Sequence, residues 1–200
     1  HVLGGDQLYG RSLRMLQKDL PRLGVTASFA DAGSVEAMRA ALRPETKLIL
    51  IEVVSNPTLR VADLHCLVAL AKERGILLAV DNTFTTLRAA QPLLAGADIV
   101  IHSLTKYIDG HGATIGGIIV DSGKFDWAKQ PEKFPMLNQP DPSYHGIVYT
   151  KTFGAAAFIG CARVVPLRES GACLSPNNAY IIMLGLESLG VRMERHCKNA

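Results

Sequence analysis

The feature that most constrains this fold is a series of short apolar runs that alternate with helical patterns. Residues 47–54, 76–80 and 98–101 are rich in Val, Ile, Leu and Ala, and a helical pattern over 63–74 separates the first two. Strands that are apolar on both faces are typical of parallel sheets whose two sides are covered by helices. We therefore predict an α/β fold with a mostly parallel sheet sandwiched by helices.

Local signals predict further elements around these strands. Helical spacing, caps and terminal Gly or Pro residues predict helices over residues 11–20, 34–42, 89–94, 152–165, 176–189 and from 191 onward. Apolar runs predict two more strands, over 25–29 and 113–120. Residues 121–142 are rich in proline and aromatic residues, so we expect a structured flap there instead of a flexible linker.

The ends of the chain lead us to expect part of a longer protein. It begins with His1 instead of Met, and its last residues have a helical pattern. We expect residues 1–185 to form one domain whose first part is missing. Residues 186–200 are then expected to form a helix that connects to a truncated C-terminal domain.

Composition and charge exclude several classes of function. The chain has 48% hydrophobic and 20% charged residues, as globular proteins do, and its net charge of +3 is dispersed. It has no basic cluster interleaved with aromatic residues, which argues against nucleic acid as a partner. No apolar run is long enough to span a bilayer. The four cysteines are far apart without a CxxC pair, so we expect reduced thiols and a cytoplasmic location.

Polar residues follow the predicted strands at the points where the strands end. The carboxyl ends of neighbouring parallel strands meet at one edge of a sheet, where α/β proteins bind their ligands. We therefore expect one crevice there. The residues that should converge on it are Glu52, Ser55, Asn56, Asp81, Asn82, Thr83, Ser103, Thr105 and Lys106.

This set of side chains matches the needs of pyridoxal 5′-phosphate. The cofactor requires a lysine for its aldehyde, a carboxylate at its ring nitrogen and donors for its phosphate. Lys106 follows an apolar strand, where we expect it to lose part of its solvation and to favour the neutral, nucleophilic amine. Asp81 lies one strand earlier, and Ser103 and Thr105 flank the lysine. No cysteine or histidine pair has metal-ligand spacing, so we expect no metal site.

Four motifs in order resemble the Cys/Met-metabolism family of pyridoxal phosphate enzymes. They are residues 8–10 (LYG), 55–59 (SNPTL), 80–84 (VDNTF) and 102–107 (HSLTKY). The resemblance implies the pyridoxal phosphate-binding large domain of the aspartate-aminotransferase-like fold. It also implies that the full-length protein is a dimer of dimers.

The resemblance implies a role for each matching residue. Lys106 would form a Schiff base with the cofactor and later move protons on the substrate. Asp81 would pair with the ring nitrogen, and Asn56 would contact the phenolic oxygen. Tyr9 would stack on the ring and assist the leaving group. The remaining roles are phosphate binding by Ser103 and Thr105 and support by Thr83 and Glu52.

Several later segments resemble the O-acetylhomoserine sulfhydrylase branch of this family. They are residues 110–112, 116–127, 140–146, 174–176, 185–189 and 192–196. That branch implies a γ-replacement in which acetate leaves O-acetylhomoserine and sulfide or a thiol adds, giving homocysteine or a related product. A cystathionine or methionine γ-lyase and a cystathionine γ-synthase remain alternatives, because elimination and replacement share their early steps.

A different class of function also stays open. Arg11 and the pair Leu87-Arg88 depart from the family pattern. The family's glycine-containing phosphate loop is expected before His1, and the arginine for the substrate carboxylate is expected beyond Ala200. The chain could therefore be a catalytically incomplete module that only binds cofactor or supports assembly. A nicotinamide-dependent dehydrogenase is excluded, because no strand–glycine–helix fingerprint is present.

Overall fold

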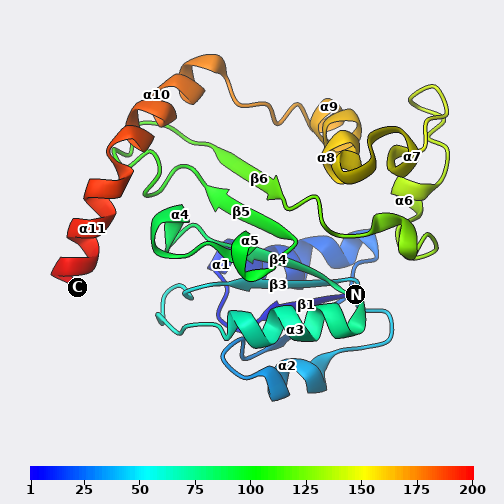
Figure 1. Ribbon diagram of the computed structural model, residues 1–200, viewed down its shortest axis with the longest axis horizontal. Coiled ribbons are helices and arrows are strands. Elements are labelled where there is room, and N and C mark those ends of the chain that lie inside the picture. Colours follow the sequence, from blue (N-terminus) through cyan, green and yellow to red (C-terminus); the bar gives the residue numbers. More distant parts are fainter. The chain divides into compact units, whose positions relative to one another are not determined.

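The computed structural model describes residues 1–200 and contains a six-stranded sheet. The strand order is β2-β1-β3-β4-β5-β6 (Figure 1). The first five strands run parallel, and the arrow of β6 points against that of β5 in Figure 1. The predicted mostly parallel α/β sheet is thus confirmed. The strands are β1 (Val2–Gly5), β2 (Ala27–Ala30), β3 (Leu48–Glu52), β4 (Leu77–Asp81), β5 (Ile99–Ser103) and β6 (Gly117–Asp121).

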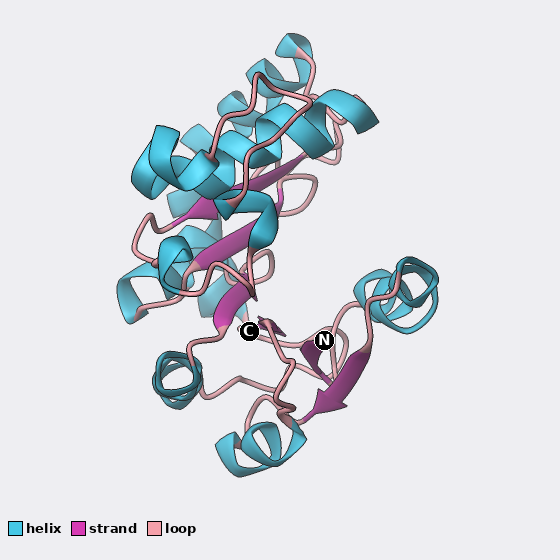
Figure 2. Ribbon diagram, turned by 90° about the vertical axis from the view of Figure 1, so that its right-hand side faces the viewer, coloured by secondary structure: helices cyan, strands magenta, loops and turns pink.

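Helices and loops make up most of the remaining chain (Figure 2). The helices are α1 (Gly10–Arg14), α2 (Val35–Ala41), α3 (Leu64–Arg74), α4 (Thr86–Ala89), α5 (Pro92–Ala95), α6 (Pro135–Asn138), α7 (Tyr149–Phe153), α8 (Ala157–Ala162), α9 (Arg168–Ser170), α10 (Pro176–Glu187) and α11 (Leu189–Asn199). None of them is both long and apolar enough to cross a membrane.

The sheet core explains why these apolar runs become central strands. Ile49, Ile51 and Val80 are fully buried, and Leu67 of α3 and Met38 of α2 belong to the same core. Each such side chain contributes about 1.5–3 kcal/mol by leaving water. Side-chain caps begin both helices, since the side chains of Ser34 and Asp63 accept hydrogen bonds from backbone amides of the first turn.

Some predicted elements differ in the structure for local reasons. The predicted helix 11–20 is α1, followed by a wide π turn and a 3₁₀ turn that ends at Gly24 with a left-handed φ of 78°. The predicted helix 152–165 is interrupted at Gly154, and its second part runs into a π turn that contains Pro166. The predicted strand 113–120 begins only at Gly117.

The chain divides into two compact units. The first comprises residues 1–120 and 176–200, and the second comprises residues 121–175. The second unit contains the predicted flap, whose Trp127 is buried among three phenylalanine rings. The predicted domain boundary between residues 185 and 186 stays a prediction.

Candidate functional site

A pocket of ≈ 760 Å³ lies at the carboxyl ends of β3, β4 and β5, within the first unit. This is the edge of a parallel sheet where the strand-end rule predicts a ligand site. The structure therefore brings the predicted site residues together from four separate stretches of chain. Those that line the pocket are Tyr9, Glu52, Asn56, Asp81, Thr83, Ser103, Thr105 and Lys106.

Thr83 links the ends of β4 and β5. Its backbone N–H donates to Asp81 Oδ1 at 2.9 Å, and its hydroxyl oxygen accepts from the backbone N–H of Ser103 at 2.7 Å. These two bonds fix the Asp81 carboxylate relative to the start of the loop that carries Lys106. The sequence predicts Thr83 among the cofactor-binding residues, in a supporting position, and that role stays a prediction.

Asn82 braces the loop behind Asp81, and the sequence patterns gave it no role beyond the strand-end set. Its buried side-chain amide donates to the carbonyl oxygens of Thr86 and Ala90, at 2.9 and 3.0 Å, and its side-chain oxygen accepts from the Thr85 hydroxyl. Asn82 thereby holds residues 83–90 in a compact turn. Within that turn, Thr86 is buried with a left-handed φ of 55°, which is unusual for a β-branched residue.

Glu52 holds the backbones of Tyr9 and Asn56, the two residues that the sequence predicts to contact the cofactor ring. One carboxylate oxygen accepts from the backbone N–H of Tyr9 at 2.6 Å, and the other accepts from the backbone N–H of Asn56 at 3.1 Å. Burial raises the pKa of Glu52, and the neighbouring Asp81 carboxylate raises it further, whereas the two N–H donors lower it. One carboxylate thus sets the position of both loops.

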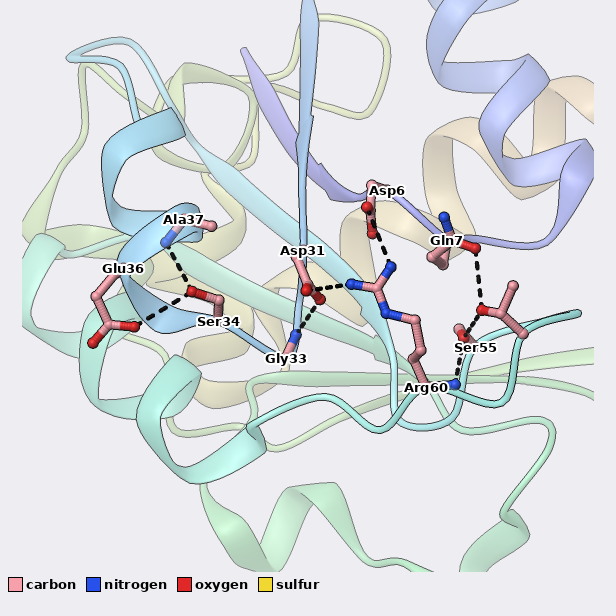
Figure 3. Close-up of polar contacts among 10 residues, drawn as sticks. Asp6, Gln7, Asp31, Gly33, Ser34, Glu36, Ala37, Ser55 and Arg60 are labelled. Atoms are coloured by element: carbon pink, nitrogen blue, oxygen red, sulfur yellow. Dashed lines mark hydrogen bonds and ion pairs between the residues drawn. The ribbon is translucent and has the colours of Figure 1, made fainter.

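An exposed polar network holds the loop that carries Asn56 (Figure 3). Arg60 pairs with Asp31 and with Asp6, and its backbone N–H donates to Ser55 Oγ at 2.9 Å. Surface ion pairs of this kind contribute about 0–1 kcal/mol each. Their effect is therefore mainly to choose one arrangement of residues 55–60, close to the ends of β1 and β2.

Lys106 differs from our expectation in one respect. Its side chain is exposed, so the predicted loss of solvation past a buried strand is wrong for this structure. The lysine follows β5 by three residues and lies in a tight turn, in which the Gly110 N–H donates to the Lys106 carbonyl at 2.8 Å. The turn aims the lysine at an open pocket instead of burying it.

The two hydroxyls predicted to bind phosphate differ in their hydrogen bonds within the chain. The Thr105 hydroxyl donates to the Gly116 carbonyl and accepts from the Gly116 N–H, both at 3.3 Å. The Ser103 hydroxyl makes no such bond within the chain. Both line the pocket, so Ser103 is the freer of the two donors for a ligand anion.

His102 lies under the site as a buried histidine. It is 6% exposed, and its Nδ1 is buried without a hydrogen-bond partner. Burial lowers the pKa of His102, while the nearby Asp81 carboxylate and the Asn82 backbone partly raise it. The neutral imidazole is therefore the favoured form.

Residues far along the chain complete the pocket wall. Arg192 and His196 of α11 line it together with Tyr107 and Phe84. Arg192 belongs to a basic stretch of α11, residues 192–198, but it does not face only solvent, since its guanidinium contacts the backbone after Lys106. No local signal could have found this contact, because 85 residues separate the partners.

The donor set fits pyridoxal phosphate chemically. The pocket offers an exposed primary amine, a carboxylate held by one backbone bond, a free hydroxyl and a half-exposed tyrosine ring. These are the groups that the aldehyde, ring nitrogen, phosphate and ring face of the cofactor require. No group of three or more His, Cys, Asp or Glu side chains in residues 1–200 could hold a metal ion.

Comparisons with known proteins agree with this chemistry. The sequence profile of the family described as Cys/Met metabolism PLP-dependent enzyme matches residues 1–200. The sulfhydrylase FUB7 of Fusarium oxysporum f. sp. lycopersici is 46% identical over 203 residues, covering 100% of this chain and 46% of that protein. The chain thus spans about half the length of the curated relatives it matches.

Two solved structures have the same fold. A Campylobacter jejuni protein that carries N′-pyridoxyl-lysine-5′-monophosphate has a TM-score of 0.92 and 32% identity, over 100% of this chain and 49% of that one. The O-acetylhomoserine sulfhydrylase of the methionine biosynthetic pathway of Wolinella succinogenes has a TM-score of 0.81 and 35% identity, over 100% and 54% of the two chains.

Proposed function

Because this chain belongs to the Cys/Met metabolism PLP-dependent enzyme family, we propose that its pocket binds pyridoxal 5′-phosphate for a γ-replacement on O-acetylhomoserine. Acetate leaves the γ-carbon, and sulfide or a thiol adds there, giving homocysteine or its thioether. The observation that carries the proposal is the convergence of Lys106, Asp81 and Ser103 on one pocket. The sulfhydrylase names of the relatives favour replacement over elimination.

The bound cofactor supplies an electron sink for negative charge that develops on the substrate. In our proposal, Lys106 Nζ would hold the cofactor at its aldehyde as a Schiff base and would take and return protons at the substrate carbons. The Asp81 carboxylate would pair with the ring nitrogen and keep it protonated. Thr83 supports this role, because its N–H orients Asp81 Oδ1.

The remaining residues bind and orient. We propose that the Ser103 and Thr105 hydroxyls donate to the phosphate, that the Asn56 amide donates to the phenolic oxygen and that Tyr9 stacks on the ring and assists the leaving group. Glu52 supports the last two roles by fixing the backbones of Tyr9 and Asn56. We also propose a cytoplasmic dimer of dimers as the working assembly, with the first domain spanning residues 1–185.

The test uses the full-length protein that contains this chain. Purified protein with pyridoxal phosphate, O-acetylhomoserine and sulfide should release acetate and homocysteine in equal amounts, and Lys106→Ala should not. Release of acetate and 2-oxobutanoate with sulfide present, without homocysteine, would assign the protein to the γ-lyases instead. A protein that binds the cofactor but does not consume the ester would favour the catalytically incomplete module, and a protein that does not bind the cofactor would refute the proposal.

A further inference from the structure

Arg192 makes an unusual set of hydrogen bonds for an arginine in a pocket wall. Nη1 donates to the Tyr107 carbonyl at 2.8 Å, and Nη2 donates to the carbonyls of Gly185 at 2.7 Å and Ile108 at 3.5 Å. Nε donates to Ser188 Oγ at 3.0 Å. All four acceptors are neutral, and no ion pair of Arg192 is present. The guanidinium therefore serves to join backbones, not to neutralise a carboxylate.

Two of these acceptors are the first two carbonyls after Lys106. The Lys106 side chain is exposed, and no hydrogen bond holds its amine. Its position therefore depends on its own backbone turn. That turn contains a long bond from the Lys106 N–H to the Ser103 carbonyl, 3.4 Å, and shorter ones from the Asp109 N–H to the Leu104 carbonyl, 2.9 Å, and from the Gly110 N–H to the Lys106 carbonyl, 2.8 Å. Arg192 adds a planar brace from a distant helix to this turn, at the two carbonyls directly after Lys106.

Close packing shows that the helices and this turn are fitted to one another. A Cβ added to Gly185 of α10 would lie 2.1 Å from the Asp109 carbonyl oxygen, and one added to Gly110 would lie 2.3 Å from Arg192 Nη1. Real Cβ atoms never come so close to their neighbours. Gly185 therefore allows the α10–α11 corner to reach the backbone of the turn, and Gly110 leaves room for the Arg192 guanidinium.

The ring next to the lysine is held from both sides. Tyr107 contacts His196 of α11 edge-on at 5.2 Å and Phe84, three residues after Asp81, edge-on at 6.0 Å. Aromatic pairs in this geometry contribute beyond their buried area. The turn that carries Lys106 is thus clamped between α11 and the loop that follows the Asp81 strand.

We infer that Arg192 is a positioning residue for Lys106, which makes α11 part of the lysine site and not only a connecting helix. This inference rests on the proposed function for its catalytic consequence, but its structural part does not. Small misplacements of a reacting group cost about 10²-fold in rate. Loosening the turn should therefore reduce turnover without removing any group that touches the substrate.

The experiment compares Arg192→Lys with Arg195→Lys in the full-length protein. Lysine keeps the charge of Arg192 but cannot bridge two carbonyls as the planar guanidinium does. Arg195 is exposed on the same helix and makes no such bonds, so it is the matched control. Backbone amide exchange without cofactor is the first measurement. Amides of residues 106–113 should exchange about 10-fold faster in Arg192→Lys and unchanged in Arg195→Lys.

Turnover is the second measurement. In Arg192→Lys, kcat should fall by about 10²-fold with KM changed by less than about 3-fold, and borohydride should fix cofactor on Lys106 more slowly. Ser188→Ala, which removes the acceptor of Arg192 Nε and the bond from Ser188 Oγ to the Gly185 carbonyl, should move exchange and kcat in the same direction by about 3-fold. Ser188→Ala therefore tests the same inference if the Arg192→Lys protein does not fold.

The outcomes separate the two proposals. Unchanged exchange and unchanged kcat in both Arg192→Lys and Ser188→Ala would overturn the positioning role, even if the wild-type enzyme is active. A wild-type protein that never forms a borohydride-fixed adduct would refute the proposed function. In that case the exchange comparison alone would still decide whether Arg192 holds the turn.

Discussion

Two aspartates, one in each compact unit, show how the same side chain serves chemistry in one place and architecture in the other. Asp81 accepts one hydrogen bond, from the Thr83 N–H, and faces the pocket. Asp141 accepts three, from the Tyr149 hydroxyl at 2.6 Å and from the amide and hydroxyl of Ser143 at 2.8 and 2.7 Å. A carboxylate with free acceptor capacity can take a ligand, whereas a fully engaged one holds its own loop.

Among the predicted changes in the pocket, removal of the Lys106 amine should have the largest effect on turnover. Lys106→Ala should lower kcat by about 10⁴-fold or more, since nothing else in the pocket can replace a primary amine at that position. Its exposed side chain packs little, so circular dichroism and the melting temperature should stay close to the wild type. Turnover within about 10-fold of the wild type would show that another lysine bears the cofactor.

Neutralising the pocket aspartate should be the next largest effect. Asp81→Asn keeps the shape but removes the charge that would face the ring nitrogen, so kcat/KM should fall by about 10³-fold. The measurement pairs steady-state kinetics with urea unfolding. We expect little change in the unfolding midpoint. A midpoint that falls together with activity would show that Asp81 mainly stabilises the fold.

The opposite pattern is expected in the second unit. Tyr149 is fully buried, and its hydroxyl donates to a carboxylate, which raises the pKa of Tyr149 and lowers that of Asp141. Tyr149→Phe should cost about 2 kcal/mol of unfolding free energy. Cofactor affinity, measured below the melting temperature, should be unchanged. A loss of affinity without a loss of stability would remove the contrast between the two aspartates.

The smallest effect concerns pH and the buried histidine under the site. The folded state lowers the pKa of His102 from its ordinary 6.5 because burial disfavours the charged ring. Below that pH the unfolded chain binds a proton more readily than the folded one, so stability is lost as pH falls through 6.5. The loss cannot exceed about 1.4 kcal/mol per pH unit. His102→Asn should show a flatter profile in urea unfolding between pH 7.5 and 5.5.

The parts of the site that the sequence predicted share one physical origin. The strands that carry the site can be predicted from local apolar runs, and at their ends lie Asp81, Asn56 and Lys106. Parallel pairing then brings the ends of neighbouring strands together. β1 escaped prediction, because its four residues include Gly4 and Gly5, which carry no strand preference. β1 nevertheless forms a strand, because it is buried between β2 and β3 in the sheet.

The parts that the sequence did not predict depend on distant contacts. Arg192 meets the backbone of Tyr107 across 85 residues, and a surface-like charge pattern on α11 gives no sign of it. The exposure of Lys106 likewise depends on how the chain turns after β5, not on how apolar β5 is. The break at Gly154 was not predicted, because the helical pattern of apolar positions over 152–165 continues through that glycine.

The buried side-chain amide of Asn82 determines how deamidation, a common form of chemical damage, would affect this protein. Deamidation would exchange one NH₂ group for an oxygen, a change of one mass unit. In the fold, that atom faces the carbonyl oxygens of Thr86 and Ala90, so two attractions would become two repulsions in a buried place. The loss is on the order of several kcal/mol. Because the two bonds fix the side-chain amide, we expect the deamidated form to accumulate mainly in chains that have already unfolded.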